Sequence, residues 1–155
     1  MPHLKQPTTT RVHRWLAIPT FILALAGCKS IVGPPDPPQM CVKIEASMNL
    51  NQFEGQPHVV VLYFFGLQSP TGFLGADLTR LVNGEKPPGM IGERLEATVL
   101  PNQRVELQEQ LPRDTPYVGV VADFYRKPSG AVLEPSCGVF GGSKIVLSAT
   151  DMQVK

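Results

Sequence analysis

The chain has 155 residues, of which 43% are hydrophobic, and its 14 basic side chains nearly balance 13 acidic ones, for a formal charge of +1. This balance lacks the excess of positive charge that nucleic-acid binding requires, so that class of function is not expected. The length suits one folded domain with a single hydrophobic core.

The first 27 residues have the order of regions found in a secretory signal. Lys5, Arg11 and Arg14 supply positive charge with no acidic residue among them, and residues 15–26 then carry no charged side chain. A run of that length is too short to span a bilayer as a helix, which takes about 20 apolar residues. We therefore predict a cleaved export signal over residues 1–27.

Leu25-Ala26-Gly27-Cys28 ends this region and resembles the lipobox of bacterial lipoproteins, whose cysteine carries a thioether-linked diacylglycerol. The resemblance implies lipid attachment at Cys28. Lys29 stands where an aspartate would favour retention in the inner membrane, which implies sorting to the outer membrane. The alternative is that Cys28 is a buried apolar residue ending an ordinary signal. Cleavage before Cys28 leaves 11 basic and 13 acidic side chains, a formal charge of about −2.

A proline-rich segment follows the lipobox. Val32–Gln39 contains four prolines, which exclude a helix and favour an extended spacer. We predict that residues 28–40 form the lipidated cysteine and its tether, and that residues 41–155 form the folded domain. Cys41 and Cys137 remain in that domain. In an oxidising compartment they either form a disulfide or stay as two buried thiols.

Two strand patterns open the predicted domain. From Cys41 to Asn49 hydrophobic and polar residues alternate, which predicts a strand with one face in the core and one in solvent. The core face comprises Val42, Ile44, Ala46 and Met48. The run Val59–Phe65 is apolar on both faces and rich in β-branched and aromatic residues, as in a central strand. We expect these two strands to pair as the first hairpin.

Helical periodicity then occurs once. Leu74, Leu78, Leu81 and Val82 recur at spacings of three and four, which predicts a helix over residues 73–82 that Asn83-Gly84 ends. Alternation with period two returns in four later segments, at residues 94–100, 103–111, 117–126 and 144–150. A weaker alternation at residues 130–140 predicts one more strand. Together these elements predict an all-β fold, a sandwich of about seven to eight strands with a small helical insertion.

Residues that carry catalysis or bind metals are sparse in this domain. His58 is its only histidine, and one histidine before a strand is more often a surface residue than part of a catalytic or zinc site. The pairs Glu93 with Glu96 and Glu106 with Glu109 have odd spacings, which point their members to opposite faces of a strand. We therefore expect no enzymatic activity, no metal and no cofactor.

Several short segments, taken in order, resemble the outer-membrane lipoprotein of bacterial type VI secretion systems, the TssJ family, also called SciN or VasD. They are Ala46–Asn51, Gly55-Gln56-Pro57, Val59–Tyr63, Phe73 with Ala76-Asp77-Leu78, Ile91-Gly92, Leu100-Pro101 and Tyr117–Arg126. The resemblance extends over about Val42 to Lys155. The chain departs from it at Gln56, where the family commonly has arginine, at Asn102, where it has glycine, and at Val132-Leu133, where many members have tryptophan.

The resemblance implies a transthyretin-like or immunoglobulin-like sandwich with a mechanical role. Such a lipoprotein tethers the membrane complex of the secretion system to the periplasmic face of the outer membrane, by binding the periplasmic C-terminal region of the inner-membrane component TssM. The loop that makes this contact in the family corresponds to Asn51, Gln52, Phe53, Glu54, Gly55, Gln56 and Pro57. Phe53, a large apolar residue in a polar loop, either anchors a partner or folds back to cap the sandwich. The alternative function is a lipoprotein module that binds a small ligand or inhibits an enzyme.

Overall fold

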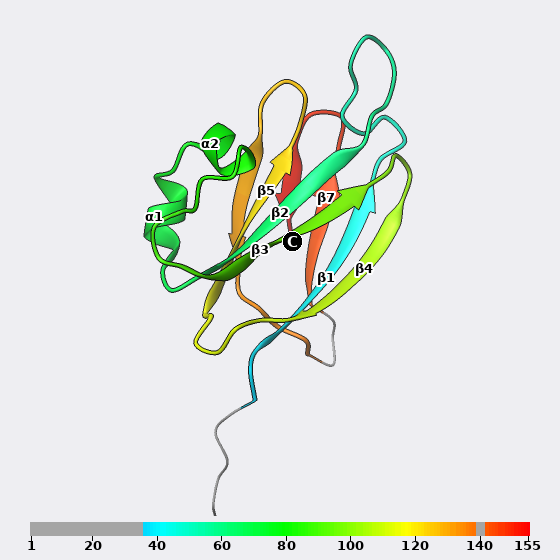
Figure 1. Ribbon diagram of the computed structural model, residues 1–155. Coiled ribbons are helices and arrows are strands. Elements are labelled where there is room, and N and C mark those ends of the chain that lie inside the picture. Colours follow the sequence, from blue (N-terminus) through cyan, green and yellow to red (C-terminus); the bar gives the residue numbers. More distant parts are fainter. Residues whose placement is uncertain (1–35, 139–141) are drawn as a thin grey trace, which may run out of the picture. The chain divides into compact units, whose positions relative to one another are not determined.

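Two four-stranded β-sheets pack face to face in the computed structural model, which describes residues 36–138 and 142–155 (Figure 1). The strands are β1 (Gln39–Ala46), β2 (Val60–Leu67), β3 (Met90–Val99), β4 (Arg104–Gln110), β5 (Tyr117–Asp123), β6 (Ser129–Leu133), β7 (Ser143–Leu147) and β8 (Met152–Val154). One sheet has the order β4-β1-β7-β8 and the other β3-β2-β5-β6. Neighbouring strands are antiparallel except β1 and β7, which are parallel. The predicted all-β sandwich is confirmed.

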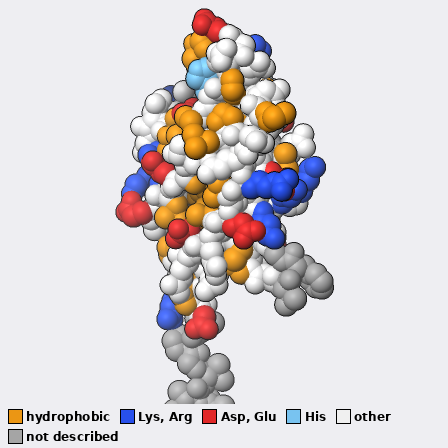
Figure 2. Space-filling model, turned by 90° about the vertical axis from the view of Figure 1, so that its right-hand side faces the viewer, with side chains coloured by type: hydrophobic (Ala, Val, Ile, Leu, Met, Phe, Trp, Pro, Cys, Tyr) orange, Lys and Arg blue, Asp and Glu red, His pale blue; other side chains and the backbone are white. Residues whose placement is uncertain are grey.

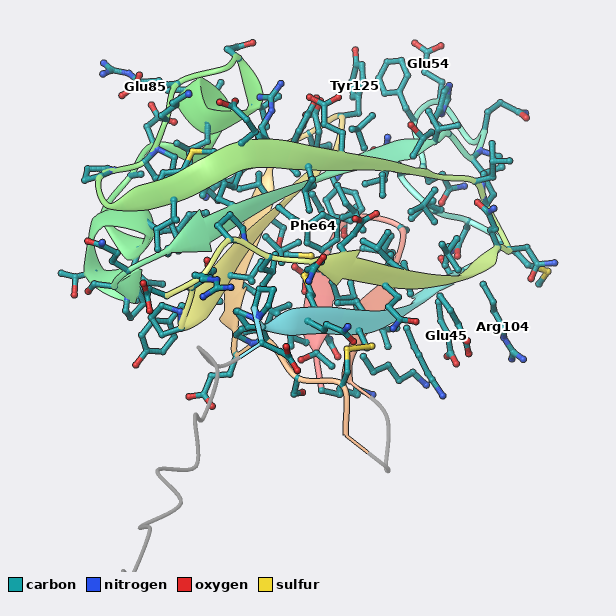
Figure 3. The ribbon with its side chains drawn as sticks, turned by 60° about the horizontal axis from the view of Figure 1, so that its bottom comes forward. Glu45, Glu54, Phe64, Glu85, Arg104 and Tyr125 are labelled. Carbon is teal, nitrogen blue, oxygen red and sulfur yellow. A yellow bond between two sulfur atoms is a disulfide. The ribbon has the colours of Figure 1, made fainter. Side chains whose placement is uncertain are left out.

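Alternating side chains of both sheets fill the space between them. Val42 and Ile44 of β1 are fully buried and belong to the same core as Leu62 and Phe64 of β2. Figure 3 shows Phe64 between the two sheets. Phe65 points to the opposite face of its sheet, where the helices cover it. β2 is therefore buried on both faces, as its continuous apolar run predicted.

The predicted hairpin of the first two strands is wrong. β1 pairs with β4 and β7, whereas β2 pairs with β3 and β5, so the two strands lie in different sheets. The connection at residues 47–59 crosses from one sheet to the other at the end of the sandwich (Figure 1). The physical reason is burial. A strand with one solvent-exposed face fits the sheet whose outer face is exposed to solvent, and a strand that is apolar on both faces fits the sheet that the helices cover.

Two short helices stand in place of the single helix predicted over residues 73–82. They are α1 (Pro70–Leu74) and α2 (Leu78–Val82). Gly75 ends α1, and the Asp77 carboxylate begins α2 by accepting a hydrogen bond from the Thr79 amide (2.9 Å). The predicted end at Asn83-Gly84 is confirmed, with Gly84 at a φ of +99°. Apolar residues from both helices pack on the same sheet face. The apolar spacing of three and four residues therefore continues from α1 into α2, although the helix is interrupted between them.

Other boundaries differ in detail from those predicted. β6 corresponds to the weak strand expected from residue 130 onward, β8 has no counterpart among the predicted strands, and β1 begins at Gln39, within the segment predicted as tether. Neither helix in the described part of the chain has the length or the apolar character needed to cross a bilayer. The predicted export signal, Cys28 and the tether up to residue 35 lie outside the described residues.

Candidate partner-binding site

The predicted contact residues Asn51 to Pro57 lie in the connection between β1 and β2, at one end of the sandwich. In Figure 1 this loop projects at the top of the domain, whereas the described chain begins at Asp36 at the bottom. The turn between β3 and β4, the loop between β5 and β6 and the turn between β7 and β8 lie at the same end as the loop (Figure 1). The site is therefore built from four connections, not from one loop alone.

A two-residue hairpin forms the outer end of the loop. The amides of Phe53 and Gln56 each donate to the other residue's carbonyl oxygen, both at 2.9 Å. Glu54 and Gly55 between them have φ values of +50° and +78°, as a type I′ turn requires. Figure 3 shows the Glu54 side chain pointing outward at this end of the molecule. The tip thus presents one negative charge on a turn of defined geometry.

The base of the loop is held in the core and against a neighbouring turn. Leu50 is fully buried, and its carbonyl oxygen accepts a hydrogen bond from the His58 amide (2.9 Å). The Gln52 amide donates to the Ala149 carbonyl oxygen (3.1 Å), which joins the loop to the β7–β8 turn. These contacts give the loop a fixed position relative to the sheets.

Asn51 connects the loop to the β5–β6 loop and to the residue before β2 through its side-chain amide. Its Nδ2 donates to the Val59 carbonyl oxygen (2.7 Å), and its Oδ1 accepts from the Tyr125 amide (2.8 Å). The residue is 7% exposed and has a φ of +48°, which asparagine tolerates better than most residues. Asn51 is therefore a positioning residue of the loop, with little surface of its own to offer a partner.

Phe53 packs on the ring of Tyr125 from the β5–β6 loop. The two ring centroids are 3.8 Å apart with 33° between the planes, and the His58 ring centroid lies 6.3 Å from that of Phe53. Phe53 is half-buried, so it neither enters the core nor stands free at the tip. Tyr125 remains 64% exposed and forms an aromatic surface continuous with the loop. No local pattern in the sequence assigns Tyr125 to this site, because Asn51 and Tyr125 are 74 residues apart in the chain and come together only in the folded domain.

Exposed hydrophobic side chains gather around this loop. Among the described residues those with a large exposed side chain are Met48, Val59, Leu74, Leu100 and Tyr125, and all except Leu74 lie in the connections at the loop end. Figure 2, viewed from the side of β4, shows hydrophobic side chains beneath the histidine at this end. An exposed apolar group of this kind is typical of an interaction surface.

The prediction that Met48 faces the core is wrong. Its side chain is 75% exposed, because β1 ends at Ala46 and the chain turns before the alternation can continue. Leu100 comes close to this turn, since the Asn102 amide donates to the Ser47 carbonyl oxygen (3.0 Å). Leu74 is also exposed, although the predicted helical stripe included it.

Of the remaining candidate residues, the two cysteines lie apart from the loop end, and His58 lies at it. Cys41 and Cys137 are joined by a disulfide, with 5.0 Å between their Cα atoms. His58 is exposed, and its Nδ1 lies within hydrogen-bond distance of the Gln56 carbonyl oxygen (2.9 Å). In residues 36–138 and 142–155, no three histidine, cysteine or acidic side chains come together as metal ligands.

Comparison with protein families gives one match over most of the domain. The family model described as "Type VI secretion lipoprotein, VasD, EvfM, TssJ" matches residues 38–133, which run from the start of the first strand to the end of β6 and include the loop. A search of curated proteins found no match. The matched family is one of secretion-system lipoproteins and not of enzymes.

Three solved structures illustrate the similarity in fold. The type VI lipoprotein TssJ1 from Pseudomonas aeruginosa is 23% identical, with a TM-score of 0.62 over 77% of this chain and 95% of its own. A chain in the structure of the TssM C-terminal domain from EAEC is 19% identical, with a TM-score of 0.64 over 76% and 98%. Serratia marcescens Lip, a membrane-bound type VI component, is 19% identical, with a TM-score of 0.64 over 77% and 98%.

Proposed function

The chain belongs to the family of type VI secretion lipoproteins, and we propose that it links the secretion system's membrane complex to the outer membrane by binding the periplasmic C-terminal region of TssM. The loop end of the sandwich makes the contact, and acyl chains on Cys28 hold the other end at the membrane. The similarity to a chain in the structure of the TssM C-terminal domain from EAEC supports this choice of partner.

The surface around the loop is the observation that carries this proposal. Three exposed apolar side chains, Met48, Leu100 and Tyr125, belong to three different connections at this end of the sandwich. The loop between them is fixed by Leu50 and Asn51, so little ordering remains to be done when a partner binds. Rigid aromatic and apolar anchors in such a setting typically account for most of the binding free energy.

The placement of the two ends supports the tethering role. The described chain begins at Asp36, at the end of the sandwich opposite the loop (Figure 1). Residues 28–38 would span about 3 nm in a polyproline-like conformation. A lipid at Cys28 then leaves the loop facing away from the membrane, toward a partner that reaches across the periplasm.

Binding of the mature chain to the periplasmic C-terminal region of TssM from the same bacterium tests the proposal, with titration calorimetry as the measurement. Replacing Tyr125 by alanine together with Met48→Ser should weaken binding by about 30-fold or more, as loss of a hot-spot residue does. The matched control is Leu74→Ser, which removes an equally exposed apolar side chain from α1 and should leave the affinity unchanged. Equal affinities of all these variants, or no binding by the unaltered chain, would refute the proposal.

Membrane attachment has its own test in cells. The Cys28→Ala variant should lose incorporation of labelled fatty acid and leave the outer-membrane fraction, because the acyl chains on Cys28 are proposed to hold the protein at the membrane. A variant that still fractionates with the outer membrane would contradict lipid anchoring at Cys28 without bearing on the binding of TssM.

A further inference from the structure

The outer face of the β3-β2-β5-β6 sheet is only half covered. Toward one end α1 and α2 pack on it through Phe73 and Leu81, which join Phe65 and Val121 in a second hydrophobic cluster. Over the part of β2 and β3 nearest the β1–β2 loop, no helix lies in the described chain (Figure 1). In that uncovered half Val61 of β2 lies between Thr98 of β3 and Asp123 of β5 in the strand register.

A groove of about 410 Å³ lies between this uncovered half and the β1–β2 loop. Val59 and Val61 form the apolar side of the groove. His58 from the β1–β2 loop and the exposed residue Tyr125 from the β5–β6 loop also line it, and Asp123 is its acidic residue. The groove is continuous with the loop surface, because Tyr125 also stacks on Phe53.

The charges on this face leave Asp123 without a counter-charge. Arg94 of β3 is a basic residue on this face, and its guanidinium is engaged elsewhere. It binds Glu96 (2.6 Å) and the Leu81 carbonyl oxygen (3.1 Å), and it lies 4.4 Å from the centre of the Tyr63 ring. Asp123 makes no ion pair and no side-chain hydrogen bond with the described residues. It is half-buried, and this burial raises its pKa.

We propose that this groove receives an arginine side chain of the protein that binds the loop, an inference that rests on the proposed function. The Asp123 carboxylate pairs with the guanidinium, and Tyr125 offers a ring face on which a planar guanidinium can stack. Val59 and Val61 contact the methylene stem. Arginine fits better than lysine because its planar group suits both the carboxylate and the ring.

The first test uses the binding assay with TssM and a neutral isostere of the same shape. Asp123→Asn should weaken binding by about tenfold or more, because it leaves the partner's arginine unpaired at the interface. The control Glu106→Gln removes an exposed carboxylate from β4, in the other sheet, and should change the affinity by less than about twofold. The affinity of the unaltered chain should fall between about 50 and about 300 mM salt, and that of Asp123→Asn should fall less. Equal affinities of Asp123→Asn and the unaltered chain would overturn the groove assignment while leaving TssM binding intact.

A second test decides the question if the unaltered chain does not bind TssM. Titration with N-acetyl-L-arginine amide, followed by amide resonances of the mature chain, should shift the signals of Val61, Asp123 and Tyr125, whereas N-acetyl-norleucine amide should not. The same titration of Asp123→Asn should leave these signals in place. Equal shifts in both proteins, or none in either, would then overturn the inference.

Discussion

Replacing Asn51 with alanine removes two hydrogen bonds and strains the backbone at the base of the loop. The amide group of Asn51 satisfies the Tyr125 N–H and the Val59 carbonyl, and each loss costs about 1 kcal/mol, because both hydrogen bonds are only partly buried. Alanine at a φ of +48° costs about 1 kcal/mol more. The free energy of unfolding should therefore fall by about 3 kcal/mol. Urea unfolding followed by circular dichroism measures it, because Trp15, the only tryptophan, lies in the predicted signal.

The matched control for this prediction is Asn102→Ala. Asn102 has a φ of +59° in the β3–β4 turn, and its side chain makes no hydrogen bond with the described residues. This variant should lose only the strain component of about 1 kcal/mol. If Asn51→Ala is no more destabilised than Asn102→Ala, the side-chain hydrogen bonds do not hold the loop and the reasoning is wrong.

Three further changes test other parts of the structure. Replacing Cys41 and Cys137 together by alanine opens a link across 96 residues and should cost about 4 to 5 kcal/mol in urea unfolding, and a loss below about 1 kcal/mol would contradict the link. Gly119→Ala places a Cβ 2.6 Å from ring carbons of Phe73 and should cost about 1 to 3 kcal/mol in thermal unfolding, whereas no change would show that α1 does not pack there. Burial raises the pKa of Asp123 above its ordinary value of 3.8. At a pH above the raised pKa, ionisation of Asp123 therefore destabilises the folded domain, and at a pH below 3.8 it has no effect on stability. Asp123→Asn should therefore melt at a higher temperature than the unaltered chain at about pH 7 but not at about pH 3, and an equal gain at both would exclude ionisation as the cause.

Local residue patterns predict most of the strands and the burial of β1 and β2. The alternation in β1 reflects one solvent-exposed face, and the unbroken apolar run in β2 reflects two covered faces. These patterns do not predict how the two strands pair, because pairing depends on partners far along the chain, such as Glu45 opposite Arg104. β8 spans only Met152–Val154, which is too short for alternation to stand out.

The candidate site shows the same division between local and distant information. The loop and its hairpin tip follow from residues that are adjacent in the sequence, and the resemblance to the family placed the contact there. Tyr125 and Asp123 join the site only because β5 lies beside β2 in the folded sheet. Met48 was misplaced because the alternation in its segment continues past the residue where β1 ends. In contrast, Gly75 and Asp77, which end α1 and begin α2, are residue types typical of helix ends, so the break between the two helices has a local signal in the sequence.

β1 carries the chain from one end of the domain to the other in a single run of backbone. The chain enters it near Asp36 and leaves it into the loop, and hydrogen bonds to β4 and β7 flank it along its length. A pull between these ends acts along the strand, so the flanking bonds resist in shear, all at once, instead of opening one after another like a zipper. The disulfide at Cys41 lies close to the entry point and stops any peeling that starts there. The sandwich consequently behaves as a stiff link under tension.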